Sequence, residues 1–258
     1  MKIKTSEEIL LLREGGKRLA MVLEAVKKEV KPGVLARHLN DLAEKMIYAF
    51  GDEPSFLHYT AGGSLRPYPA TLCVSVNEEI VHGIPNEKEK ILKEGDIVGL
   101  DIGLKHRELF VDMAETVGVG GISKEDANLI EATRKALFVG IAKVRAGNHL
   151  HDIGCAIEKF VKSLPFKYGI VEELGGHAVG YAVHEEPYIP NFCMKERGPA
   201  LRPGAVLALE PMLNFGTKHV VFDTEDDYTV RTADGKKSAH FEHTILVTEG
   251  DPEILTSL

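Results

Sequence analysis

The chain has 258 residues, of which 44% are hydrophobic and 27% charged, and its net charge at pH 7 is −8. This composition indicates a globular protein with a large core, and the acidity argues against nucleic acid as the main partner. No stretch approaches the ~20 apolar residues of a membrane span, and the N-terminus resembles no signal peptide. The three cysteines, Cys73, Cys155 and Cys193, have no CxxC spacing. They are typical of reduced thiols in a cytoplasmic protein.

The first elements predicted along the chain are two helices. Ser6 is the expected N-cap of a helix that runs to about Lys28, and apolar residues recur at helical spacing from 39 to 47. The Gly/Pro-rich stretch 61–70 predicts a loop, and residues 72–76 predict a strand. His82 follows that strand at a turn, where a histidine alone is more typical of a structural role.

A hairpin is predicted next, with strands over 96–104 and 109–117. If His106 and Arg107 form its two-residue loop, Asp101 lies directly opposite Asp112. Like charges that face each other in a sheet are destabilising, and a divalent cation would reverse that effect. The alternative is two unrelated carboxylates on solvated faces or at strand ends.

The second half of the sequence repeats the first. Ser123 is the expected N-cap of a helix to about Val144, and a second amphipathic helix follows over 153–161. The segment from Gly204 to Glu210 matches that from Gly95 to Asp101, and Glu242 matches Asp112 because each lies eight residues before a glycine. The pattern predicts one α+β domain made of two helix–helix–strand units, about 1–120 and 121–258, in which helices back an antiparallel sheet.

Four carboxylates occupy equivalent positions of this repeat, each within an apolar strand: Asp101, Asp112, Glu210 and Glu242. Carboxylates in such strands are seldom buried unless they are paired or bind a metal. His177 and His184 lie seven residues apart, a spacing that needs a glycine-permitted bulge or loop to aim both side chains inward. This oxygen-rich set with an imidazole suits two divalent ions such as Mn, Fe(II), Co or Zn, and hence hydrolysis of an amide or ester.

The ordered motifs resemble those of the bacterial type I methionine aminopeptidases over essentially the whole chain. The segments that carry the resemblance are CVSVNEEIVHGIP (73–85), the two aspartates eleven apart, GHAVGYAVHEEP (176–187), LEPM (209–212) and FEHTILVT (241–248). The resemblance implies the duplicated "pita-bread" fold. It also implies removal of the N-terminal methionine from peptides and nascent proteins, with the ribosome as a possible partner of a monomeric enzyme.

The resemblance also implies residue roles. Two divalent metal ions would be held by Asp101, Asp112, His177, Glu210 and Glu242, with Asp112 and Glu242 bridging. Glu210 would be the general base on the bridging water, His184 would stabilise the oxyanion and His82 would contact the scissile amide. The free N-terminal amine of the substrate would bind a metal. The methionine pocket would lie near Tyr68, Cys73, Val183 and Tyr228.

Some positions depart from the commonest pattern of that family without touching an expected ligand: Leu65, Val111, Ala178, Val183 and Tyr228. Three alternatives remain open. An X-Pro dipeptidase would share the fold, but such enzymes usually carry an additional N-terminal domain. A non-catalytic scaffold would be expected to lack ligands. A metal-dependent hydrolase acting on other substrates is the third.

Overall fold

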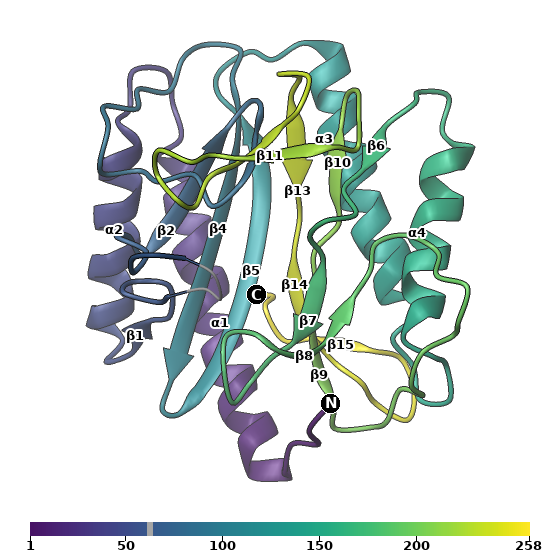
Figure 1. The fold of residues 1–258 in the computed structure, drawn as a ribbon. Coiled ribbons are helices and arrows are strands. Elements are labelled where there is room, and N and C mark those ends of the chain that lie inside the picture. Colours follow the sequence, from purple (N-terminus) through teal and green to yellow (C-terminus); the bar gives the residue numbers. More distant parts are fainter. Residues whose placement is uncertain (61–63) are drawn as a thin grey trace.

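The computed structural model describes residues 1–60 and 64–258. Its helices form two pairs, α1 (Ser6–Lys28) with α2 (Ala36–Ala49) and α3 (Lys124–Ile141) with α4 (His151–Ser163). The strands occupy the middle of the molecule, α1 passes behind β4 and β5, and α2 and α4 lie at opposite edges (Figure 1). Each half of the chain therefore contributes two helices followed by strands, which confirms the expected α+β class.

The strands are all paired antiparallel. Within the described residues the strands form four sheets, with strand orders β1-β4-β2 (and β5 beside β4), β15-β14-β9-β7-β8, β13-β10-β6 and β11-β12-β3. The bounds are β1 (Glu53–Pro54), β2 (Leu72–Val76), β3 (Glu79–Val81), β4 (Ile97–His106), β5 (Leu109–Gly118), β6 (Gly169–Ile170), β7 (Gly176–Ala178), β8 (Glu185–Ile189), β9 (Val206–Leu209), β10 (Met212–Asn214), β11 (Val220–Phe222), β12 (Val230–Thr232), β13 (Ser238–His240), β14 (His243–Leu246) and β15 (Glu253–Ile254).

The helix starts follow their capping residues. Ser123 caps α3 as expected, because its hydroxyl accepts from the backbone N–H of Asp126. The prediction of Ser6 as the first cap is wrong by one residue. Thr5 is the N-cap of α1, and it forms a capping box with Glu8, whose side chain accepts from the Thr5 N–H. The predicted loop over 61–70 lies partly outside the described residues, and its part from 64 to 70 contains no helix or strand.

The predicted hairpin exists, but its register differs by two residues. His106 pairs with Leu109, so the loop is Arg107–Glu108, and Arg107 adopts a φ of 57°. His106 belongs to the strand because its ring is buried and its Nδ1 lies 2.7 Å from Asp52 Oδ1. Asp101 consequently pairs with Ala114, and Asp112 with Gly103. The two aspartates still share a face, as diagonal neighbours.

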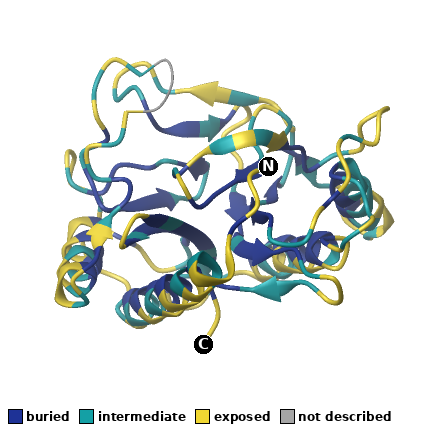
Figure 2. Cartoon of the chain, turned by 90° about the horizontal axis from the view of Figure 1, so that it is seen from below, coloured by how far each residue is buried: buried dark blue, intermediate teal, exposed yellow. Residues whose placement is uncertain are grey.

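Each helix pair covers one apolar layer. The residues of β4 that alternate with Asp101 (Val98, Leu100 and Ile102) pack into one core with α1 and α2, whereas α3 and α4 pack into a second core. Buried residues lie where helices and strands face one another, and exposed residues follow the outer helix faces (Figure 2). Because side chains alternate along a strand, Asp101 and Asp112 face away from the first helix pair.

The two halves meet along β5, at a seam that consists of β5 and residues 240–244. Ala114 and Glu242 form an antiparallel bridge, in which the Glu242 N–H donates to the Ala114 carbonyl at 2.8 Å. The Thr116 hydroxyl donates to the His240 carbonyl, and the Thr244 hydroxyl donates to the Asp112 carbonyl. These hydrogen bonds place carboxylates from both halves beside one another.

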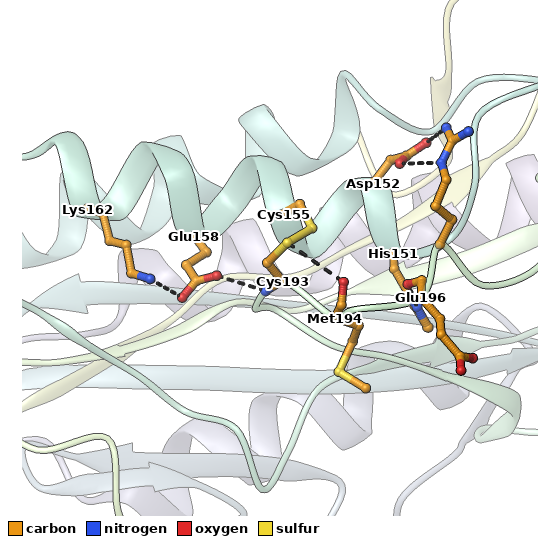
Figure 3. Close-up of a disulfide and its surroundings, with 9 residues drawn as sticks. His151, Asp152, Cys155, Glu158, Lys162, Cys193, Met194 and Glu196 are labelled. Carbon is orange, nitrogen blue, oxygen red and sulfur yellow. Dashed lines mark hydrogen bonds and ion pairs between the residues drawn. A yellow bond between two sulfur atoms is a disulfide. The ribbon is translucent and has the colours of Figure 1, made fainter.

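The cysteines differ from expectation. Cys73 is a buried free thiol, but Cys155 and Cys193 form a disulfide between α4 and the segment after β8 (Figure 3). The pairing was not visible in the sequence because tertiary contacts create it. Glu158 of α4 accepts from the Cys193 N–H at 3.0 Å, and this holds the segment against the helix.

None of the helices in the described part of the chain is long and apolar enough to cross a membrane.

A close approach at Gly103 generates a test of the fold. A Cβ built on Gly103 would lie 2.0 Å from Ser55 Oγ and 2.8 Å from a ring carbon of Phe56, whereas a Cβ on Gly99 of the same strand has its nearest neighbours at 3.7 Å. Gly103→Ala should lower the free energy of unfolding by about 1–3 kcal/mol, as overpacking does. Gly99→Ala should be close to neutral. Urea denaturation of the two variants measures this, and equal effects would contradict the packing described.

Candidate active site

A cavity of about 240 Å³ lies beside the seam, and all the predicted site residues except Val183 line it. Val183 packs in the buried cluster beside it. The candidate ligands come from separate elements: Asp101 from β4, Asp112 from β5, His177 from β7, Glu210 from the end of β9 and Glu242 from the link between β13 and β14. The other predicted residues also line it, namely His82, His184, Tyr68, Cys73 and Tyr228.

Two groups of side chains at or beside this cavity have metal-binding geometry. Asp112, His177 and Glu242 each offer one ligand atom within 4.8 Å of the others, and so do Glu210, His240 and Glu242. Glu242 belongs to both groups. Asp101 belongs to neither group but lines the same cavity. The arrangement therefore suits two neighbouring ions that share a carboxylate.

Three of these carboxyl groups have a buried oxygen that lacks a hydrogen-bond donor within the described chain. Asp101 Oδ1, Asp112 Oδ1 and Glu242 Oε1 are inaccessible and have no hydrogen-bond partner among the described residues. Burial raises the pKa of Asp101 to about 7 and that of Glu210 to about 8. Burial, reinforced by neighbouring carboxylates, also raises the pKa of Asp112 and Glu242 well above the usual range. Divalent cations would supply the missing positive charge, so the donor set fits metal ions.

His177 is prepared as a neutral ligand. Its Nδ1 lies 3.1 Å from the Ala178 carbonyl oxygen, so Nδ1 carries the proton and Nε2 is left free for a metal. Nε2 lies 3.6 Å from Glu210 Oε1. Burial lowers the pKa of His177 to about 3, which keeps the ring unprotonated at neutral pH.

The loop after β7 brings the two histidines together, as their odd spacing required. Gly180 adopts a φ of 131° in this loop, a conformation that favours glycine. The buried ammonium of Lys4 lies 3.4 Å from Glu185 Oε1 and anchors the start of β8. The rings of His177 and His184 consequently lie edge to face, with centroids 4.5 Å apart.

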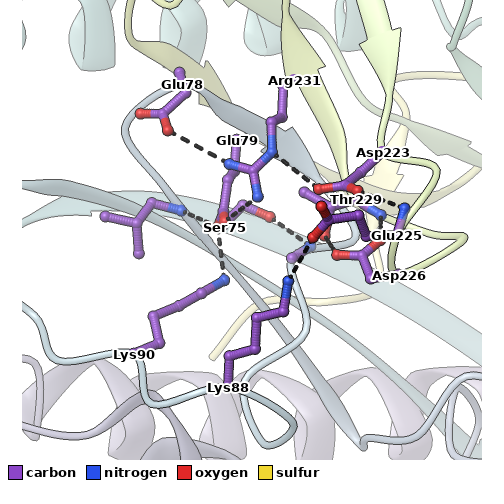
Figure 4. A network of polar contacts seen from close by, with 12 residues as sticks. Ser75, Glu78, Glu79, Lys88, Lys90, Asp223, Glu225, Asp226, Thr229 and Arg231 are labelled. Atoms are coloured by element: carbon purple, nitrogen blue, oxygen red, sulfur yellow. Dashed lines mark hydrogen bonds and ion pairs between the residues drawn. The ribbon is translucent and has the colours of Figure 1, made fainter.

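His82 is held in a strained backbone conformation, with a φ of 59°. Burial lowers its pKa to about 4, so the imidazole is neutral. A polar network supports the strand that precedes it (Figure 4). Within this network the largely buried Glu79 accepts from Lys90 Nζ at 2.7 Å and lies 3.1 Å from an Arg231 nitrogen. Arg231 belongs to β12, which pairs with β3. Because His82 directly follows β3 and Tyr228 lies just before β12, the network fixes these two residues relative to each other.

An apolar pocket adjoins the carboxylates. Tyr68, Cys73, Val183 and Tyr228 form one buried cluster, together with Phe56, Ala70 and Ile84. The Tyr68 and Tyr228 rings meet edge to face at 5.1 Å, and the Tyr68 hydroxyl donates to the Gly83 carbonyl. The pocket therefore has rigid aromatic walls.

Sequence reasoning missed two residues of the site. Tyr59 lines the cavity, and its hydroxyl lies 2.9 Å from His184 Nδ1. His240 lies 3.5 Å from Glu210. Period-two spacing from Glu242 could have indicated His240, because residues two apart on a strand share a face. The contact of Tyr59 with His184 spans 125 positions and has no local signal.

Comparisons with known proteins agree with this geometry. Residues 11–249 match metallopeptidase family M24. The chain belongs to this family. It is a metal-dependent aminopeptidase, since its relatives along the whole chain carry that activity in their names. The chain is 43% identical to methionine aminopeptidase 1 of Bacillus subtilis over 253 residues, which cover 98% of each chain.

Solved structures of other proteins share the fold of this chain. The crystal structure of methionine aminopeptidase from Thermotoga maritima has a TM-score of 0.93 and 38% identity, and each chain is covered completely. Prolidase from Pyrococcus furiosus has a TM-score of 0.74 at 19% identity, with 99% of this chain and 65% of the prolidase covered. The prolidase shows a shared fold alone. The expected pita-bread architecture is confirmed.

The raised carboxyl pKa values predict proton release on metal uptake. At pH 6, below the pKa of Asp101 (about 7) and of Glu210 (about 8), metal-free protein holds protons that a bound cation must displace. Neutral His177 contributes none. Titration of weakly buffered, metal-free protein with Mn(II) in a pH-stat should therefore release protons. Metal uptake without proton release would contradict the assigned protonation.

Proposed function

We propose that the chain removes an N-terminal methionine from peptides and nascent proteins. The observation that carries this proposal is the aromatic pocket of Tyr68, Cys73 and Tyr228, which opens into the same cavity as the carboxylates. A flexible, apolar thioether side chain suits such a pocket, because sulfur packs favourably against aromatic rings. The names of the relatives in Bacillus subtilis and Thermotoga maritima support the same substrate.

In this proposal five residues hold two divalent ions: Asp101, Asp112, His177, Glu210 and Glu242. Asp112 and Glu242 would be shared between the ions. For Glu242, membership in both ligand groups supports this role. Bound ions of this kind act as Lewis acids and lower the pKa of water to ~7. Mn, Fe(II), Co and Zn all suit a set of carboxylates with an imidazole.

Glu210 is the proposed general base. Its carboxylate lies at the end of β9, 3.6 Å from His177 Nε2, and it lines the cavity. The carboxylate accepts a proton from the attacking water and returns it to the amine that leaves. A carboxyl whose pKa is raised to about 8 by burial is matched to proton transfer near neutral pH.

His184 is the proposed donor to the scissile carbonyl. The Tyr59 hydroxyl lies 2.9 Å from His184 Nδ1. In the proposed tautomer the hydroxyl donates to Nδ1, and the ring proton is on Nε2. That N–H then stabilises the negative charge that develops on the carbonyl oxygen. His82 lines the same cavity and contacts the scissile amide as a neutral imidazole.

Release of the first residue tests the proposal. Metal-stripped protein would be assayed with and without Mn(II), Co(II) or Fe(II) on a Met-Ala-Ser peptide and on an Ala-Pro dipeptide. Metal-dependent release of methionine alone is expected. Cleavage of Ala-Pro instead would identify an X-Pro dipeptidase, and binding of metal without release from either peptide would favour a scaffold or another hydrolase.

Removal of the shared carboxylate separates metal binding from folding. Glu242→Ala should abolish metal binding and activity, whereas the fold should survive, because the backbone bonds to Ala114 remain and one buried like charge is lost. Calorimetric metal titration, peptide hydrolysis and circular dichroism measure the three properties. Glu249→Ala, an exposed site on the same segment, is the matched control. Full activity in Glu242→Ala would overturn the metal assignment.

We also propose that the chain acts in the cytoplasm as a monomer of one catalytic domain, on nascent chains at the ribosome. The duplicated order of helices and strands supports the single domain. Ribosome co-sedimentation and gel filtration are the direct measurements.

A further inference from the structure

His240 is the one side chain of the second ligand group that the proposed function leaves unused. It ends β13 and is 2% exposed. Its backbone is fixed to β5, because its N–H donates to Thr116 Oγ1 at 2.8 Å and its carbonyl accepts from the same hydroxyl at 2.9 Å. Glu242, two residues on, also pairs with β5. Ligand atoms of His240 and Glu242 lie within 4.8 Å of each other, so the two side chains lie on the same side of the seam.

The His240 ring faces Glu210. Its Nε2 lies 3.5 Å from Glu210 Oε2, is inaccessible and has no hydrogen-bond partner among residues 1–60 and 64–258. Leaving such a nitrogen buried and unpaired is costly, so the site is incomplete without a further group. One ligand atom each from Glu210, His240 and Glu242 lies within 4.8 Å of the others.

The separation favours a shared ion over a direct hydrogen bond. A distance of 3.5 Å is at the outer limit for hydrogen bonding between nitrogen and oxygen. Two ligand atoms that each lie about 2.0–2.2 Å from a tetrahedral ion are roughly 3.4 Å apart. The observed spacing is therefore that of two ligands of one metal.

We propose that His240 binds the second ion directly through Nε2, as a sixth protein ligand beside Glu210 and Glu242. This inference rests on the proposed function and adds to its ligand set. Each ion then has one imidazole, His177 for one and His240 for the other, and the two ions share Glu242. A second imidazole shifts metal preference toward Zn, Co and Fe(II) and away from Mn, which prefers oxygen ligands.

Zinc K-edge X-ray absorption of the full chain loaded with two equivalents of Zn(II) tests the ligand directly. The imidazole scattering per zinc should correspond to one ring per ion in the native protein and to half of that in His240→Gln. His177→Gln should retain half as well. His219→Gln removes an exposed imidazole outside the cavity and should leave the signal unchanged.

Metal affinity provides a second measurement. Competition with a chelating dye should show that His240→Gln weakens binding of the second Zn(II) by at least about tenfold, since even groups that only orient ligands have effects of that size. Binding of Mn(II) should weaken less. Circular dichroism shows whether the variant folds. If it does not fold, the X-ray absorption spectrum of the native protein still decides, because it distinguishes one ring per ion from one ring per two ions.

The outcomes distinguish failure of the His240 ligand from failure of the proposed metal centre. An unchanged imidazole signal in His240→Gln, with a reduced signal in His177→Gln, would overturn the inference and leave the proposed function intact. Zinc binding that neither substitution alters would overturn the proposed metal centre itself.

Discussion

The structure depends on the burial of like charges where its two halves meet. Asp112 from the first half and Glu242 from the second lie at the Ala114–Glu242 bridge. Their buried atoms Asp112 Oδ1 and Glu242 Oε1 have no hydrogen-bond partner in the described part of the chain. Burial opposes ionisation of both groups. At neutral pH the buried carboxyls therefore hold protons until a cation displaces them, so metal binding is coupled to the protonation of the seam.

The remaining architecture holds this charged seam in place. Each helix pair packs on the outer side of its own strands, so the opposite side is free to carry polar groups. Threonine hydroxyls connect the halves without adding charge, as Thr116 and Thr244 do. A separate network around Glu79 and Arg231 fixes the segments that carry His82 and Tyr228. The ligands and the pocket are thus positioned by independent supports.

Much of this organisation could be predicted from the sequence, because apolar periodicity and the internal repeat place the helices and the four acidic positions. The hairpin register could not, since the burial of His106 against Asp52 moved the loop by one residue. The Cys155–Cys193 disulfide and the Tyr59–His184 contact escaped for the same reason. Each joins residues far apart in the chain, and only the folded structure brings them together.

The division of the ligand set between the halves has a consequence for cooperativity. Residues 1–120 contain Asp101 and Asp112, and residues 121–258 contain His177, Glu210 and Glu242, so neither half alone offers all the proposed ligands. Any fluctuation that parts β5 from residues 240–244 also opens the metal centre. A bound ion would therefore stabilise the contact between the halves. Loss of the ion and separation of β5 from residues 240–244 would be thermodynamically linked.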